Sequence, residues 1–163
     1  MEGKTTKPRA ILVFGAPASG KTTFCEKFSK QFRAPYYNLT EIETRLGFDR
    51  KKMLEVLDLI AKTGQNFIIE GELNTEQDRE EIKKLLRNNG YTPSLIWIQT
   101  DINTIRTRLK VRLKSVEKAK AEYAKKIAEL EAPAEDENPI VLSGKHTFET
   151  QLTHVLSRMA ELI

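Results

Sequence analysis

A short glycine-containing segment near the start of the sequence has the residue types and the spacing needed to hold phosphate. Gly15 and Gly20 are five positions apart and Lys21 and Thr22 follow directly, which is the Gly-x-x-x-x-Gly-Lys-Thr pattern of a phosphate-binding loop. Glycines let the backbone curl with its N–H groups pointing inward, and a helix that begins there adds partial positive charge. The pattern predicts that Lys21 reaches the β- and γ-phosphates of a nucleoside triphosphate and that Thr22 is a ligand of Mg²⁺. The predicted phosphate-binding residues are Gly15, Ala16, Pro17, Ala18, Ser19, Gly20, Lys21, Thr22 and Thr23.

Two carboxylates follow apolar segments that we expect to be strands. Glu70 comes directly after Phe67–Ile69, and a charge at the end of a buried strand is costly unless it has a partner or a function. Further back, Thr40 and Glu43 have the spacing of a capping box, which would leave Glu41 as the freer carboxylate of that segment. Both positions are expected to lie where strands end beside the phosphate-binding loop.

Basic residues gather between Arg106 and Lys126, where nine lysines and arginines stand against two glutamates. Arg108 and Arg112 are four residues apart and would therefore share one face of a helix. Such a face can bind phosphate, but it can equally be a solvated surface or a strip for nucleic acid. Only Tyr123 could stack on a base in this segment, which makes the nucleic-acid alternative less favoured.

Apolar segments and helical segments alternate along the chain, which predicts an α/β fold. The apolar segments are short and mostly lack alternation, as is typical of a parallel sheet that is buried on both faces. We therefore expect a three-layer sandwich with a five-stranded parallel sheet. The expected strands are 9–14, 35–39, 66–70, 93–99 and 139–142. The expected helices are 21–32, 40–46, 49–62, 75–89, 102–131 and 147–162.

The phosphate-binding loop and the order of the surrounding segments resemble the small P-loop kinases, the group that holds adenylate kinase, shikimate kinase, polynucleotide kinase and the zeta toxins. The resemblance covers nearly the whole chain and is specific at the loop. It implies the P-loop nucleoside triphosphate hydrolase fold of the nucleotide kinase type. It also implies that ATP and Mg²⁺ are bound and that the γ-phosphoryl group is transferred to a hydroxyl or phosphate of a small molecule, a nucleotide or a nucleic-acid end.

The same resemblance suggests where the acceptor binds. Related kinases carry an acid after the second strand, so the general base would be Glu41, Glu43 or no residue of this segment, with Glu41 favoured over Glu43. Arg45 resembles an arginine that binds phosphate in these enzymes. Ile69-Glu70-Gly71 is similar to the zeta toxins, which implies that Glu70 orients the acceptor or the hydration shell of Mg²⁺.

The nucleotide side of the site is implied in the same way. Arg108 and Arg112 are similar to the lid pair that covers ATP in adenylate kinases, where guanidinium groups can stabilise charge on the transferred phosphoryl group. Gly144, Lys145 and His146 resemble a loop that contacts the adenine, largely through its backbone.

A single domain is expected over residues 1–163, with a lid at about 106–138. The polar composition after Val116 predicts that the lid is anchored at its start and mobile from about Ser115 to Asn138, with a loose loop over 133–139. The alternative is a surface excursion without function.

Composition excludes several other classes. One cysteine, Cys25, excludes an intramolecular disulfide and a zinc site of several cysteines, and we expect it to be a small core residue. A net charge of +4 suits an anionic ligand. Apolar runs are too short to cross a membrane and the sequence starts with polar residues, so we expect a cytoplasmic monomer. A non-catalytic nucleotide-dependent regulator and a nucleic-acid-binding ATPase stay open as alternatives.

Overall fold

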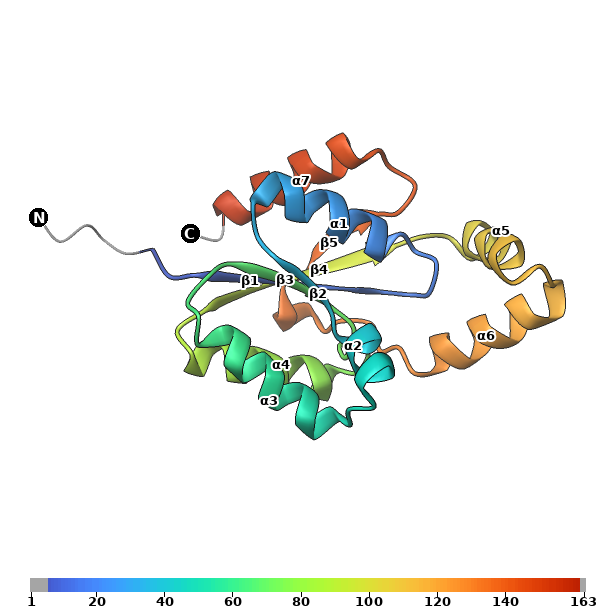
Figure 1. Ribbon diagram of the computed structural model, residues 1–163. Coiled ribbons are helices and arrows are strands. Elements are labelled where there is room, and N and C mark those ends of the chain that lie inside the picture. Colours follow the sequence, from blue (N-terminus) through green and yellow to red (C-terminus); the bar gives the residue numbers. More distant parts are fainter. Residues whose placement is uncertain (1–5, 162–163) are drawn as a thin grey trace, which may run out of the picture.

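Five parallel strands form one sheet with helices on both faces in the computed structural model, which describes residues 6–161 (Figure 1). The strand order is β2-β3-β1-β4-β5, so the predicted three-layer α/β fold with a P-loop kinase topology is confirmed. The strands are β1 (Arg9–Gly15), β2 (Tyr36–Asn38), β3 (Phe67–Glu70), β4 (Thr92–Gln99) and β5 (Ile140–Ser143).

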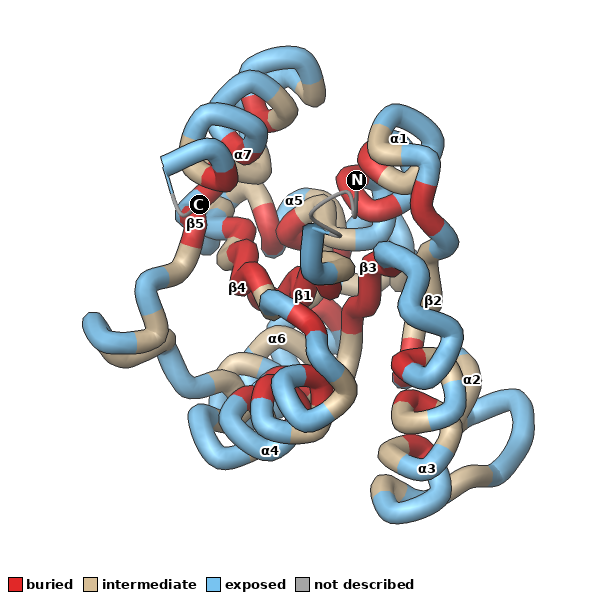
Figure 2. The backbone as a smooth tube through the Cα atoms, turned by 90° about the vertical axis from the view of Figure 1, so that its left-hand side faces the viewer, coloured by how far each residue is buried: buried red, intermediate tan, exposed pale blue. Residues whose placement is uncertain are grey.

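The central strand β1 separates two apolar layers. Leu12 and Phe14 point into the layer beneath α3 (Arg50–Ala61) and α4 (Glu76–Asn88), whereas Ile11 and Val13 point toward α1 (Lys21–Phe32) and α7 (Phe148–Glu161). Both faces of β1 are buried, which explains its continuous apolar sequence. Figure 2 shows the buried strands at the centre and the exposed outer surfaces of the helices around them. Cys25 is fully buried in the α1 layer, as expected.

The register of the sheet brings the candidate residues to one edge. Val13 pairs with Glu70, and Asn38 on β2 pairs with Glu70 from the other side. Gly15, the last residue of β1, pairs with Ile98 on β4. The carboxyl ends of parallel strands meet at this edge, which is where open α/β sheets bind ligands. Residues 38 and 70 are far apart in sequence but are neighbours in the sheet.

The single helix predicted over 102–131 is wrong. The chain forms two helices, α5 (Ile102–Leu113) and α6 (Val116–Ala128). Lys114 between them has a φ of 54°, and Ser115 caps α6 by accepting a hydrogen bond from the Lys118 N–H. The two helices form a hairpin that projects beyond the carboxyl edge of the sheet (Figure 1). We call residues 102–130 the lid hairpin.

A small apolar cluster lies between the two helices of the lid hairpin and also includes Ala16 of the phosphate-binding loop. Ile105, Leu109 and Ala119 are buried there, with Tyr123 and Ile127 partly buried against them. Tyr123 therefore packs inside the hairpin, although the sequence offered it as the single aromatic residue for stacking on a base.

Residues 133–139 are also not the loose loop that the sequence predicts. A short 3₁₀ helix, Glu135–Glu137, brings the Glu137 side chain into the protein, where it is 2% exposed and pairs with Arg79 and Lys83 of α4. The return from the lid is thus fixed by buried ion pairs.

Across residues 6–161, no helix combines the length and the hydropathy required to cross a bilayer.

Candidate active site

The phosphate-binding loop joins β1 to α1, as the sequence predicts. Ala18 and Gly20 have positive φ values of 58° and 100°, and these turn the backbone around the loop. Gly15 has no room for a side chain, because a β-carbon there would overlap the carbonyl oxygen of Ile98. Gly20 is the amino-terminal cap of α1 and no side chain caps the helix. The first N–H groups of α1 are thus left for an anion.

Lys21 closes this loop from the inside. Its Nζ donates hydrogen bonds to the carbonyl oxygens of Gly15 at 2.8 Å and Ala16 at 2.9 Å. Burial lowers the pKa of Lys21, the carboxylate of Glu70 opposes that change, and the charges of Arg112 and Lys126 add to it. A polyphosphate beside Lys21 would supply the anion that this ammonium group lacks.

Glu70 is the centre of a hydrogen-bonded cluster at the end of β3. It is 3% exposed, and its Oε1 accepts hydrogen bonds from Thr22 Oγ1 at 2.6 Å, from Asn38 Nδ2 at 3.3 Å and from the Tyr36 hydroxyl. Burial and the neighbouring Glu70 raise the pKa of Tyr36 far above its ordinary value, so its hydroxyl remains a donor. The sequence analysis missed Tyr36 and Asn38. They could have been found because the expected second strand ends at the same edge of the sheet as the third strand.

The pair of Thr22 and Glu70 fits a magnesium ion. Mg²⁺ prefers oxygen ligands and is usually held by one or two carboxylates or hydroxyls together with phosphate oxygens and water. Within residues 6–161, no three His, Cys, Asp or Glu side chains form a protein cage for a metal. A hydroxyl and one carboxylate at the phosphate-binding loop are therefore the donor set expected for a metal that arrives with a nucleotide.

These residues open into a cavity of about 670 Å³. The phosphate-binding loop lines its floor, and Arg108, Arg112, Lys126 and Leu130 of the lid hairpin line the opposite side. A third part of the wall is formed where β2 and β3 end. We call this part the acceptor wing, after the expectation that an acceptor binds on this side, and its residues are Asn38, Thr40, Gly71, Leu73 and Asn74.

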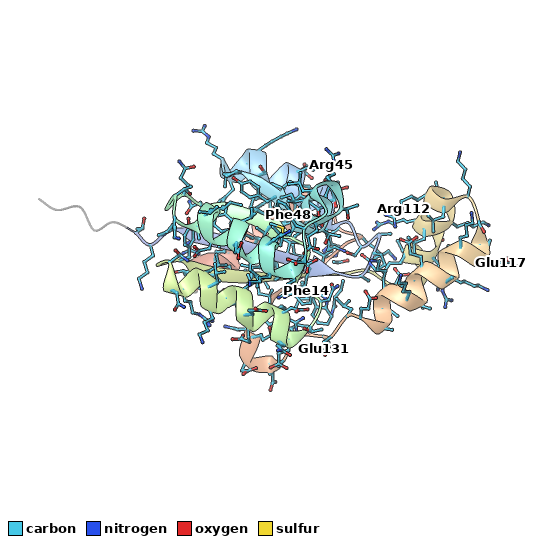
Figure 3. All side chains as sticks on the ribbon, turned by 60° about the horizontal axis from the view of Figure 1, so that its bottom comes forward. Phe14, Arg45, Phe48, Arg112, Glu117 and Glu131 are labelled. Carbon is cyan, nitrogen blue, oxygen red and sulfur yellow. The ribbon has the colours of Figure 1, made fainter. Side chains whose placement is uncertain are left out.

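The two predicted lid arginines differ in their contacts. Arg108 donates to the carbonyl oxygens of Ala18 at 2.9 Å and Gly144 at 3.1 Å, so it joins the phosphate-binding loop to the loop after β5. Arg112 is 54% exposed, lies 3.5 Å from Glu122 of α6 and lines the cavity (Figure 3). Lys126 lines it as well. The sequence placed Lys126 only in the basic segment, because one position within nine basic residues carries no separate signal.

The loop after β5 contributes unequally. Gly144 and His146 line the cavity, whereas Lys145 pairs with Asp101 at 3.3 Å, outside the cavity wall. A β-carbon at Gly144 would overlap the carbonyl oxygen of Ser19. This close approach holds the loop directly against the phosphate-binding loop.

Glu41 and Arg45 are not brought to the cavity. They form an ion pair with each other at 2.7 Å on the outer surface of α2 (Leu39–Leu46), with side chains that are 51% and 76% exposed (Figure 3 labels Arg45). The predicted capping box of Thr40 and Glu43 is wrong. The helix starts earlier, and Asn38 caps it by accepting a hydrogen bond from the Glu41 N–H at 3.1 Å.

Glu43 instead belongs to an acidic group behind the acceptor wing. Partial burial and the carboxylate of Glu72 raise its pKa to about 7, against the charge of Arg50. Arg50 is itself held by Glu72 at 3.1 Å and by Asp78 and Glu81 of α4. Neither Glu43 nor Glu72 lines the cavity.

The sheet order, the phosphate-binding loop and the basic hairpin above it define a P-loop kinase fold, which confirms the resemblance to the small P-loop kinases. The sequence matches the model of an AAA domain family over residues 11–133, and the chain belongs to this family. A comparison of the sequence with curated proteins finds no match.

Solved structures share the whole fold. A gluconokinase from Sinorhizobium meliloti 1021 has a TM-score of 0.73 at 14% identity and covers 96% of this chain and 94% of its own. Kti12 of Chaetomium thermophilum, solved in complex with ADP-AlF3, has a TM-score of 0.73 at 14% identity, covering 93% and 97%. The APS kinase CysC of Mycobacterium tuberculosis, in complex with AMPPNP and APS, has a TM-score of 0.69 at 12% identity, covering 94% and 98%. At such low identities, these TM-scores show a common fold and nothing further.

Proposed function

We propose that the protein is an ATP-dependent kinase that transfers the γ-phosphoryl group to a hydroxyl of a small molecule. The observation that carries this proposal is the convergence of Lys21, the Thr22–Glu70 pair, Arg112 and Lys126 on one cavity that also has an acceptor wing. In the transfer, the bond between the γ-phosphorus and the bridging oxygen of ADP breaks. A bond from phosphorus to the acceptor oxygen forms, and the acceptor hydroxyl releases its proton to water.

Such a reaction depends chiefly on positioning and charge neutralisation. Lys21 would exchange the carbonyl oxygens of Gly15 and Ala16 for phosphate oxygens. Arg112 and Lys126 would approach the same phosphates from the lid hairpin and exclude water. Mg²⁺ bound at Thr22 and Glu70 would neutralise charge on the phosphates.

The acceptor wing supports a hydroxyl compound without charge. Its described side chains are the amide of Asn74, the hydroxyl of Thr40, the apolar Leu73 and the amide of Asn38, which also binds Glu70 and caps α2. Amides and hydroxyls can bind several hydroxyl groups but cannot neutralise an anion. The basic residues nearest in sequence, Arg45 and Arg79, are each paired with a carboxylate, and Arg50 is likewise bound by acidic partners.

The test is a phosphorylation screen with labelled ATP. The panel contains neutral polyols and sugars, sugar acids, nucleosides, nucleotides and oligonucleotides, with Lys21→Ala as the inactive control. We expect a phosphorylated product from a neutral hydroxyl compound that is absent with Lys21→Ala. Transfer that persists in Lys21→Ala, or wild-type protein that binds ATP but labels nothing, would contradict the proposal. The latter result would favour a non-catalytic regulator.

A further inference from the structure

Arg79 of α4 is a buried arginine that the phosphate-transfer chemistry does not use. Its side chain is fully buried and its guanidinium lies 4.7 Å from the ring centre of Phe14, which lines the cavity floor. Nη1 donates to the carbonyl oxygens of Leu73 at 3.0 Å and Asn74 at 3.2 Å. These two residues belong to the acceptor wing, so one side of this guanidinium holds the wing in place.

The same guanidinium also holds the segment that leaves the lid hairpin. Nη1 donates to the carbonyl oxygen of Glu131 at 3.0 Å, while Nε and Nη2 bind the two carboxylate oxygens of Glu137 at 2.8 and 2.9 Å. Lys83 Nζ is a second cation on Glu137, at 2.9 Å. Burial alone would raise the pKa of Glu137, but Arg79, Lys83 and the Ala134 N–H hold it at about 2.

Two direct hydrogen bonds complete the connection. The Glu131 N–H donates to the carbonyl oxygen of Asn74 at 2.8 Å, and the Glu76 N–H donates to Glu131 Oε2 at 2.9 Å. Leu130, the residue before Glu131, lines the cavity from the lid side. Figure 3 shows Glu131 where the chain returns from the lid helices toward α4. The acceptor wing thus meets residues 131–137, which we call the root of the lid hairpin, at Arg79.

We infer that Arg79 is a positioning residue that joins the acceptor wing to the root of the lid hairpin. These two walls of the cavity therefore move together. Residues 131–137 then move together with Leu73 and Asn74, so an acceptor seated against these two residues changes the position from which the lid hairpin closes. The role of the acceptor wing rests on the proposed function. The connection that Arg79 makes between the wing and the root of the lid hairpin, which we call the joint, does not rest on it and can be tested in the protein without nucleotide.

Hydrogen exchange measures the joint directly. Glu137→Gln removes the charge that Arg79 and Lys83 face, and Glu135→Gln on the same 3₁₀ helix is the matched control because Glu135 is exposed. We expect Glu137→Gln to accelerate exchange roughly tenfold or more in both segments that Arg79 joins, residues 74–78 and 129–134, because local opening there costs less. Exchange in β1, which requires global opening, should accelerate less than in these two segments, and Glu135→Gln should alter neither segment.

A second variant separates the joint from the ion pair. Arg79→Lys keeps a cation for Glu137 but cannot also donate to the three carbonyl oxygens, because an ammonium group lacks the planar fork. It should therefore accelerate the same two segments. Acceleration of one segment without the other in either variant, or equal acceleration in β1, would overturn the inference.

Repeating the measurement with AMPPNP and Mg²⁺ tests the coupling. In the wild type, nucleotide should slow exchange in α6 and also in residues 74–78, whereas in Glu137→Gln it should slow exchange in α6 but not in residues 74–78. The same slowing of 74–78 in both proteins would overturn the coupling. If AMPPNP alters no exchange at the phosphate-binding loop, the proposed function fails while the nucleotide-free result still decides the joint.

Discussion

Replacing Glu70 with glutamine isolates the charge of the carboxylate at the centre of the site. All three donors to Glu70, namely Thr22, Tyr36 and Asn38, reach the same oxygen, Oε1. Glutamine keeps an oxygen of the same geometry, so the hydrogen-bond pattern can persist while the negative charge disappears. Any loss of turnover then reports on charge rather than on position.

The expected magnitudes follow from these contacts. Hydrogen bonds to a charged group contribute about 1.5–3 kcal/mol and neutral ones about 0.5–1.5 kcal/mol, so each bond to Glu70 weakens by roughly 1 kcal/mol. The lower cost of burying a neutral amide offsets part of that loss, so the fold should persist. Turnover should fall at least tenfold, about 1.4 kcal/mol of barrier, because a carboxylate that orients Mg²⁺ or the acceptor is gone.

Tyr36→Phe is the matched control. It removes one donor to Glu70 and leaves the charge in place. We expect less than about threefold loss of turnover, ~0.6 kcal/mol of barrier. The assay is steady-state ATP turnover with varied Mg²⁺, together with ATP binding in the absence of metal. Binding without metal should change little in either variant.

One competing explanation can be separated by pH. The carboxylate of Glu70 raises the pKa of Lys21 against burial, so its removal makes Lys21 easier to deprotonate. A deficit caused by Lys21 would grow with pH, whereas a deficit in Mg²⁺ binding would shrink as Mg²⁺ is raised. Wild-type turnover in Glu70→Gln, or equal losses in Glu70→Gln and Tyr36→Phe, would refute the reasoning.

Three further predictions concern charge at other positions. Arg112→Ala and Lys126→Ala should each lower turnover more than Lys125→Ala, because Lys125 does not line the cavity. Equal small effects of all three changes would show that the lid hairpin takes no part in phosphoryl transfer. The pKa of Glu43 is raised from 4.5 to about 7, so the folded state binds a proton that the unfolded state has lost, and stability should fall as pH rises between these values. Melting temperatures at pH 5 and pH 8 should therefore show Glu43→Gln gaining on the wild type as pH rises, and parallel curves would contradict this. Because burial lowers the pKa of Lys21 in the free protein, ATP binding at alkaline pH should take up protons; calorimetry over an alkaline pH series, in two buffers with different ionisation enthalpies, measures this, and no uptake at any pH of the series would contradict it.

Local rules in the sequence were sufficient for the region from β1 to α1, which includes the phosphate-binding loop. The Gly-x-x-x-x-Gly-Lys-Thr spacing, together with the apolar runs before and after it, predicted β1, the phosphate-binding loop and α1 at their observed places. The loop and the start of α1 depend on contacts between near neighbours in the chain, whereas β1 was found by its apolar run although it pairs with the distant strands β3 and β4. The helix start after β2 was misassigned because Asn38 and Thr40 are both good caps, and the strand brings Asn38 into the capping position first.

On the acceptor side of the site, local reasoning also found only the contacts between residues that are close in sequence. Glu41 and Arg45 are four residues apart, and on the helix they satisfy each other at the surface. Glu70 finds its donors on β2 through the sheet register, which brings Tyr36 and Asn38 beside it from more than thirty positions away. A sequence motif therefore predicts the role of a residue well only where the contacts of that residue are made by other residues of the same motif.

The root of the lid shows why composition misled there. Residues 133–139 are rich in acidic residues and proline, and this composition is typical of solvated loops because unpaired charges stay in water. Arg79 and Glu137 are 58 positions apart, and each reads as a surface charge when taken alone. Once α4 packs on β4 and the chain returns to β5, the two charges meet out of water, where either one without the other would be strongly destabilising. Burial therefore makes this pair an obligatory contact, and it ties the start of β5 and the end of the lid to the helix beneath the acceptor wing.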